Sequence, residues 1–248
     1  AGDVNGDGYA DVVIGANFND DTGSNAGEAY VYHGSASGLS ATPDWSDQGE
    51  AVNDQFGKGV ASAGDVNGDG YADVIVGAAA NDDGGSNAGA AYVYSIGASA
   101  AVNAWAQQAL TGATTSYFGV SVASAGDVNG DGYGDVIVGA YQDASGTGKT
   151  YVYHGSASGI GSTAAQTLTG ENSGDYFGWS VASAGDVNGD GYDDVIIGAY
   201  EYDSSDDEGR AYIYHGSSDL SVLDLLGVAK GEKYIIIRFV SWAATHDI

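Results

Sequence analysis

The sequence predicts an all-β fold, a β-propeller with four blades in this chain. One observation is a nine-residue acidic loop that occurs four times, beginning at Asp3, Asp65, Asp127 and Asp186. A second is that each copy is followed by a run of β-branched residues, which favours a strand over a helix. The copies are spaced by about 60 residues, so the chain is an array of supersecondary units. Four short antiparallel strands in a unit of this length are typical of a propeller blade.

Composition supports this fold class and excludes some functions. The 248 residues include 42 glycines, one proline and no cysteine, so turns are built without proline and disulfides contribute nothing. The formal net charge of −28 argues against nucleic acid as a partner, because phosphate binding needs a basic patch. No apolar run approaches the roughly 20 residues that a membrane span requires.

Each unit is expected to contain four strands, and the second unit shows them clearly. Its first strand begins at Phe56-Gly57, and the acidic loop 65–73 follows. The apolar run at 73–78 predicts a strand buried on both faces, and the alternation at 91–94 predicts a half-exposed strand. The fourth, outer strands are expected near 43–48, 104–111 and 165–169.

The acidic loop has the composition of a calcium site. Its positions 1, 3, 5 and 9 carry oxygen side chains, position 7 can offer a backbone carbonyl, and glycines at 4 and 6 permit a tight backbone. Hard oxygen ligands suit Ca²⁺, whereas Mg²⁺ demands stricter geometry and zinc or copper would need Cys or His. An acidic turn without metal would explain one loop but not four copies that keep every ligand position. About four Ca²⁺ ions are therefore expected, on Asp3, Asn5, Asp7, Tyr9, Asp11, Asp65, Asn67, Asp69, Tyr71, Asp73, Asp127, Asn129, Asp131, Tyr133, Asp135, Asp186, Asn188, Asp190, Tyr192 and Asp194.

The loop is not an EF-hand, although its first half resembles one. An EF-hand needs a bidentate Glu at position 12 and a helix after the loop. Counted from Asp65, position 12 is Val76, and the residues around it favour a strand. The loop therefore closes at its ninth residue and joins two strands of a hairpin.

The order Phe-Gly, acidic loop and Gly-Ala (Gly77-Ala78 in the second unit) resembles the FG-GAP repeat. That repeat builds the propeller of integrin α subunits and of many bacterial secreted proteins, and the resemblance covers roughly residues 1–217. It implies calcium in the hairpin between the first two strands of a blade. It also implies a ligand face on the opposite side, which here would contain the loops 17–27, 79–89, 142–148 and 201–209. Integrin propellers have seven blades, whereas this chain supplies four.

Closure of the propeller is left open by the sequence. Residues 1–219 are expected to form four blades, and 220–248 form a divergent tail. The first unit lacks a Phe-Gly strand, and 239–245 lies where that strand would follow the last blade, so it could close a four-bladed ring. Two chains could instead form an eight-bladed dimer, or the chain could be a piece of a longer propeller.

The expected function is non-enzymatic. His33, His154 and His215 recur at one equivalent position, whereas a catalytic histidine is usually unique. We expect a calcium-binding extracellular propeller that serves in adhesion or binds a protein ligand, because weak calcium sites fill at millimolar calcium outside the cell.

Other functions remain open. The chain could be a calcium-dependent lectin with a glycan ligand, an accessory domain of a larger secreted enzyme, or a scaffold that assembles into homo-oligomers. The tryptophans are expected to serve mainly in packing, although some could stack on sugars; they are Trp45, Trp105, Trp179 and Trp242.

Overall fold

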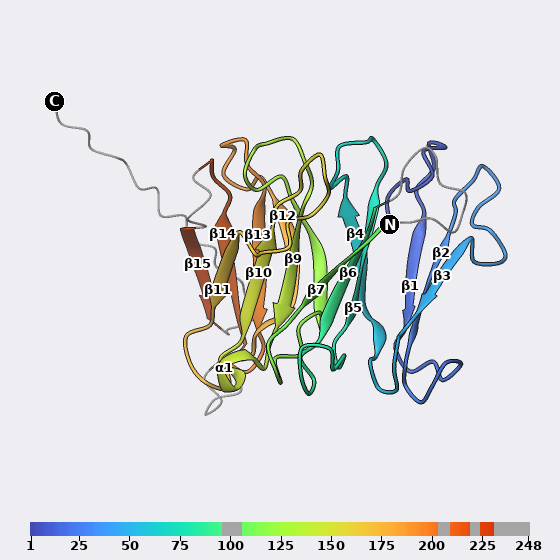
Figure 1. Cartoon of the computed structure of the whole chain (residues 1–248). Helices are drawn as coiled ribbons and strands as arrows, with labels where there is room; N and C mark the ends of the chain where they lie inside the picture. The colour runs from blue at the N-terminus through green and yellow to red at the C-terminus, as the bar shows by residue number, and fades with distance from the viewer. Residues whose placement is uncertain (96–105, 203–208, 219–223, 231–248) are drawn as a thin grey trace.

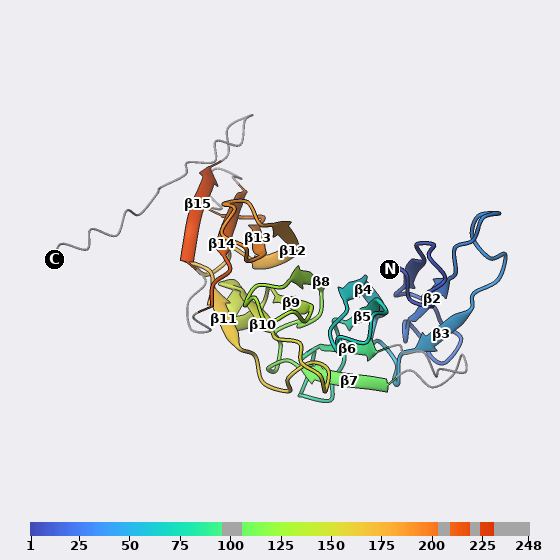
Figure 2. The same cartoon turned by 90° about the horizontal axis from the view of Figure 1, so that it is seen from above.

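The chain folds into four antiparallel sheets that lie side by side along an arc (Figures 1 and 2). The computed structural model describes residues 1–95, 106–202, 209–218 and 224–230. Within each sheet, strands that follow one another in the sequence are neighbours. This arrangement confirms the prediction of an all-β protein with four propeller blades.

The blades contain three or four strands each. Blade 1 consists of β1 (Val12–Ala16), β2 (Glu28–Tyr32) and β3 (Trp45–Gln48). Blade 2 consists of β4 (Phe56–Gly64), β5 (Asp73–Ala78), β6 (Ala90–Ser95) and β7 (Ala106–Thr111). Blade 3 consists of β8 (Ser121–Gly126), β9 (Asp135–Ala140), β10 (Lys149–Tyr153) and β11 (Gln166–Thr169). Blade 4 consists of β12 (Phe177–Gly185), β13 (Asp194–Ala199), β14 (Arg210–His215) and β15 (Asp224–Lys230).

The second strand of a blade is the most deeply buried. All six residues of β5 and all six of β9 are buried, as their unbroken apolar runs predicted. Each of these strands pairs with a strand on both sides, and neighbouring blades cover both of its faces. Blade 1 differs because β1 pairs only with β2, so its other edge is open within the described residues apart from one bridge between Gly2 and Asp11.

Three apolar cores lie between consecutive blades. The Phe-Gly phenylalanines anchor them: Phe56, Phe118 and Phe177 are at most 2% exposed. Each packs against a tyrosine on the third strand of its own blade; the ring centroids of Phe177 and Tyr212 are 5.1 Å apart. Because each core is shared by two blades, a blade is stabilised mainly by its neighbours, as in other repeat proteins.

Part of the divergent tail belongs to a blade. Strand β15 comes from the tail and pairs with β14 as the outer strand of blade 4, in the position that β7 and β11 hold in blades 2 and 3. The proposed closing segment 239–245 lies outside the described residues, so closure by that segment stays a prediction. Within the described residues, blade 1 and blade 4 lie at opposite ends of an open arc (Figure 2).

Two tryptophans have different environments. Trp45 is 9% exposed and packs edge-on against Tyr94 of the next blade, with 4.8 Å between ring centroids, which confirms a packing role. Trp179 is 43% exposed, so it departs from the main expectation of packing and matches the alternative that some tryptophans could stack on sugars, which stays a prediction. Trp105 and Trp242 lie outside the described residues.

The described part of the chain has little helix. Its single helix is the four-residue α1 (Asp143–Gly146), a turn in the loop between β9 and β10. No helix in the described ranges has the length and apolar character needed to cross a bilayer.

Candidate metal-binding loops

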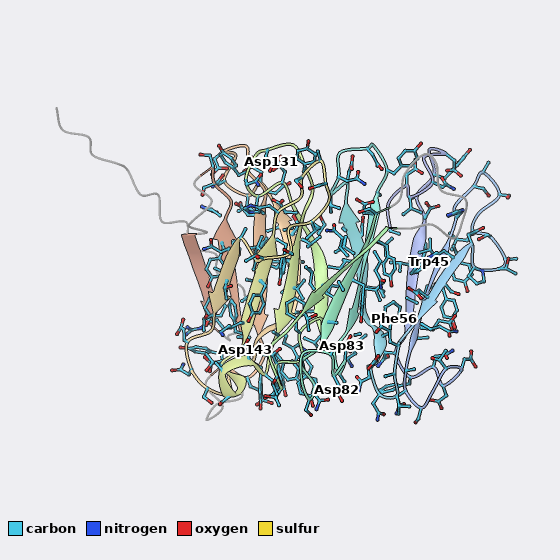
Figure 3. All side chains as sticks on the ribbon, viewed as in Figure 1. Trp45, Phe56, Asp82, Asp83, Asp131 and Asp143 are labelled. Carbon is cyan, nitrogen blue, oxygen red and sulfur yellow. The ribbon has the colours of Figure 1, made fainter. Side chains whose placement is uncertain are left out.

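The four acidic loops lie at one end of the blades. In blades 2, 3 and 4 the loop joins the first strand to the second, and in blade 1 it precedes β1. Figure 3 shows Asp131 of the third loop at this end and Asp82, Asp83 and Asp143 at the opposite end. The structure thus places all four predicted ligand sets on one face.

The first aspartate organises each loop through its own backbone. In the third loop, Oδ1 of Asp127 accepts hydrogen bonds from the N–H groups of Gly130 (2.7 Å) and Asp131 (3.0 Å), and Oδ2 accepts one from Gly132 (2.9 Å). The other three loops repeat these bonds. Gly130 and Gly132 have φ of 74° and 90°, a conformation that glycine adopts without steric cost.

Positions 3 and 5 lie side by side on the exposed part of the loop. Oδ1 of Asn129 accepts a hydrogen bond from the N–H of Asp131 (2.9 Å), and Oδ1 of Asp131 accepts one from the N–H of Tyr133 (3.0 Å). The Asn129 side-chain amide also donates to Oδ2 of Asp131 (2.9 Å). The structure therefore brings the predicted ligands at positions 1, 3 and 5 into one turn.

The aspartate at position 9 is buried and has a second role. Asp135 is fully buried, and its two oxygens accept hydrogen bonds from the N–H groups of Val128 and Gly155, both at 2.9 Å. Gly155 follows β10, so this carboxylate ties the loop to the third strand. Asp11 and Asp194 make the matching pair of bonds, to Val4 and Gly34 and to Val187 and Gly216. Sequence reasoning assigned this residue only to metal.

The tyrosine at position 7 points away from its own loop. In blades 2, 3 and 4 its ring lies over the glycine at position 4 of the preceding loop, so Tyr71 covers Gly6. A β-carbon added to Gly68 would lie 2.7 Å from Cε1 of Tyr133, and one on Gly130 would lie 2.6 Å from Cε1 of Tyr192. The recurrence of Tyr and Gly in every loop was the available signal for this contact between blades. Only the backbone carbonyl of position 7 is left as a candidate ligand.

The donor set fits a hard cation, although it is not fully assembled. In the part of the chain that the structure describes, no three Asp, Glu, His or Cys side chains are grouped closely enough to hold an ion by themselves. Each loop does offer carboxylate, amide and carbonyl oxygens on a glycine-permitted turn, which is the ligand chemistry of Ca²⁺. The assignment of individual ligands stays a prediction.

The pKa values of the carboxyl groups in these loops shift in opposite directions. Backbone N–H donors, first that of Gly191, lower the pKa of Asp186. Burial, opposed by the two N–H bonds and assisted by the charges of Asp131 and Asp127, instead raises the pKa of Asp135 to about 7. A cation beside Asp135 would offset that repulsion.

We expect the metal-free protein to lose stability as pH rises from about 4 to about 7. A carboxyl whose pKa is raised by folding binds more protons in the folded state in that window, so the free energy of unfolding falls as pH increases. A rise from 3.8 to about 7 corresponds to a loss of about 4 kcal/mol. Urea unfolding in a chelator, compared between wild type and Asp135→Asn across this range, measures the effect. Parallel pH curves for the two proteins would contradict it.

Sequence reasoning also missed an aromatic group at the opposite end of the blades. Trp179 and Tyr200 are 43% and 49% exposed, and their ring centroids are 4.9 Å apart. Tyr141 lies 4.8 Å from Trp179, and Tyr176 stacks on Tyr200 at 5.8 Å. Their sequence signal was an aromatic residue next to each Phe-Gly or Gly-Ala motif in blades 3 and 4. This group joins blade 3 to blade 4 and presents ring surface to solvent.

Comparisons with known proteins agree with the repeat architecture. The chain is 40% identical over 154 residues to integrin alpha-6 of Gallus gallus, which covers 61% of this chain and 14% of that protein. It is 39% identical over 156 residues to integrin alpha-7 of Rattus norvegicus, and the alignment covers 61% of this chain and 13% of that protein. It is 35% identical over 162 residues to integrin alpha-4 of Xenopus laevis, and the alignment covers 63% of this chain and 15% of that protein. The chain therefore spans about one-seventh of the length of these relatives.

A family profile covers most of all four blades. The profile described as "FG-GAP repeat" matches residues 1–32, 56–94, 118–153 and 177–214, which together make up more than half of the chain. Each matched segment contains one acidic loop with the strands beside it. The chain belongs to the FG-GAP repeat family.

Proposed function

We propose that the chain is a calcium-stabilised, non-catalytic propeller module that binds a ligand outside the cell. The observation that supports this most directly is the repetition of one loop frame, with the same hydrogen bonds, four times on a single face. The integrin α relatives support an adhesion module. Calcium would act as a structural ion, because the loops join strands and each buried position 9 carboxylate ties its loop into the blade.

A calcium titration tests the metal part of this proposal. Isothermal titration calorimetry is expected to give about four ions per chain. Asp69→Ala should lower the stoichiometry by one, because it removes the position 5 carboxylate of one loop. Asp69 is exposed, and its side chain accepts only two loop hydrogen bonds, from the N–H of Tyr71 (3.0 Å) and the amide of Asn67 (3.2 Å). Asp82→Ala is the control: the Asp82 side chain accepts a loop hydrogen bond from the N–H of Asn87 and lies at the opposite end. The proposal would be contradicted if the wild type gave no heat of calcium binding, or if both variants lost the same number of bound ions.

The ligand is assigned to the loops at the end opposite the calcium loops. The loops 17–27 and 79–89 are acidic and share the turn Asn-Asp-Asp, in which an aspartate (Asp20 or Asp82) accepts a hydrogen bond from the N–H five residues on. Attachment of cells to the immobilised chain is expected to fall in the double variant Asp20→Ala/Asp82→Ala. The control Asp69→Ala alters the calcium face and should retain attachment in excess calcium. Unchanged cell attachment in the double variant would contradict the assignment of the ligand site to these two loops.

A calcium-dependent lectin is the second candidate, and the exposed aromatic group favours it. Aromatic faces such as those of Trp179 and Tyr200 can stack on the apolar face of a sugar ring. Trp179→Ala should abolish retention on the sugar column that binds the wild type. If the wild type is retained on no sugar column, this candidate fails.

No residue of the described chain is assigned a catalytic role. His33 and His154 directly follow the equivalent strands β2 and β10, and His215 is the last residue of β14, so the histidines recur with the repeat. His33 lies 3.7 Å from Asp44 at the end of β2, and burial lowers the pKa of His154. These are strand-end environments rather than one asymmetric site.

A further inference from the structure

The three junctions between consecutive blades use one set of contacts. The N–H at loop position 8 donates to the carbonyl at position 1 of the preceding loop: Ala72 to Asp3 (3.0 Å), Gly134 to Asp65 (2.7 Å) and Asp193 to Asp127 (3.1 Å). The tyrosine at position 7 covers the glycine at position 4 of the preceding loop in all three junctions. One side of a blade thus carries the N–H donor and the tyrosine, which we call the donating half of the junction. The other side carries the carbonyl acceptor and the glycine, which we call the accepting half.

A third contact comes from the turn after the third strand. The N–H of Ser156 donates to the carbonyl of Val66 (3.0 Å), and that of Ser217 donates to Val128 (2.9 Å). Both acceptors are at position 2 of the preceding loop. At this position Val4, Val66 and Val128 are at most 2% exposed, because the next blade covers them.

Blade 4 presents the accepting half of this junction without a partner in the described structure. Val187, at loop position 2, is 37% exposed. A β-carbon on Gly189, at position 4, would meet nothing within 4 Å, and the same is true of Gly185 just before the loop. Gly198 would meet only Ser180 of its own blade, whereas Gly139 faces the backbone of Gly178 in the next blade.

Blade 1 presents the donating half. Tyr9, at loop position 7, is 45% exposed, whereas its counterparts Tyr71 and Tyr133 cover a glycine of the preceding loop. Ile14 of β1 is 46% exposed, although Val76 and Val138 at the same place in β5 and β9 are fully buried. Apart from the first strand, which blade 1 lacks within the described residues, the two ends of the arc therefore carry complementary halves of one contact set (Figure 2).

We propose that these two surfaces bind each other between two copies of this chain. Tyr9 of one copy would cover Gly189 of the other, with the N–H groups of Ala10 and Ser35 donating to the carbonyls of Asp186 and Val187. A contact between unlike surfaces generates either a closed ring or an open filament. The blades turn along an arc (Figure 2), which favours a closed ring over a filament, and the ring we propose contains two copies and eight blades. The inference does not depend on calcium.

The molar mass in solution tests this directly. Size-exclusion chromatography with light scattering is expected to give twice 24.9 kDa. Tyr9→Ala should weaken the dimer by about tenfold or more, the cost of removing a well-packed aromatic contact. Because Tyr9 is exposed within one chain, this variant should stay folded. Tyr133→Ala is the matched control, since its ring covers Gly68 inside the chain: it should lower the thermal stability and leave the dimer intact.

Crosslinking distinguishes two copies from one chain closed on itself. The chain has no cysteine, so Ser35→Cys/Val187→Cys introduces the only thiols, and a short bis-maleimide reagent can join them. A product of dimer mass, absent in each single-cysteine variant, is the expected result. A crosslinked product of monomer mass would show that blade 1 and blade 4 meet within one chain and would overturn the proposal. A monomer that forms no crosslink would overturn it as well.

Discussion

Chelation of calcium is expected to lower the free energy of unfolding by about 2.7 kcal/mol for each site that was filled at a hundredfold excess over its Kd. With four filled sites this is the largest single effect we expect. The reason is that the ion binds the folded loops and not the unfolded chain, and its removal leaves loop carboxylates to repel one another in a protein of net charge −28. Urea unfolding with and without a chelator, at one fixed protein concentration, measures the difference.

Magnesium is the control for this experiment. At the same concentration it should restore much less stability than calcium, because Mg²⁺ demands near-octahedral geometry and gives up its waters reluctantly. Asp69→Ala should lose about one site's share of the calcium effect. Identical unfolding midpoints with and without the chelator would contradict the calcium assignment in all four loops.

Gly139→Ala is expected to cost about 3 kcal/mol of stability, the upper part of the range for overpacking a tight core. A β-carbon here would collide with the carbonyl oxygen of Gly178 in blade 4 and with Oγ of Ser121. The obstructing atom is backbone, so blades 3 and 4 would have to move apart along the core that Phe177 anchors. Thermal unfolding compared with the wild type measures the loss.

Gly198→Ala is the matched control, because Gly198 holds the same place in blade 4. Its β-carbon would meet Oγ of Ser180, which can rotate away, and no backbone of another blade. We expect a loss below about 1 kcal/mol in the unfolding of the single chain. Equal destabilisation by both substitutions would mean that contact between blades is not the cause.

The strands were predictable because their signals are local. The β-branched runs, the alternation in the third strands and the Phe-Gly starts placed β5, β6 and β12 close to where the structure has them. The prediction that the strand at 91–94 is half-exposed is wrong, because neighbouring blades and strands bury five of the six residues of β6. The outer strand β15 was not recognised. Its residues repeat no motif of the other outer strands, and it is defined by pairing with β14.

The loops were predictable in composition and less so in role. Spacing alone identified the aspartates, but it could not show that Asp135 is buried and ties its loop to the strand after it. It also could not show that Tyr133 serves the neighbouring blade. Both roles depend on residues that are distant in the sequence and adjacent only after folding.

The sequence by itself determined the repeat, the strands of each blade and the chemistry of the acidic loops, because periodicity and turn residues act over a few neighbouring positions. Only the tertiary structure decided which copies of a repeated residue are buried and which are exposed. Val187 and Ile14 are exposed while their counterparts are buried, because within the described residues a neighbouring blade covers the counterparts and not these two side chains. Burial is a property of packing between blades, so four nearly equal sequences acquire two unequal ends.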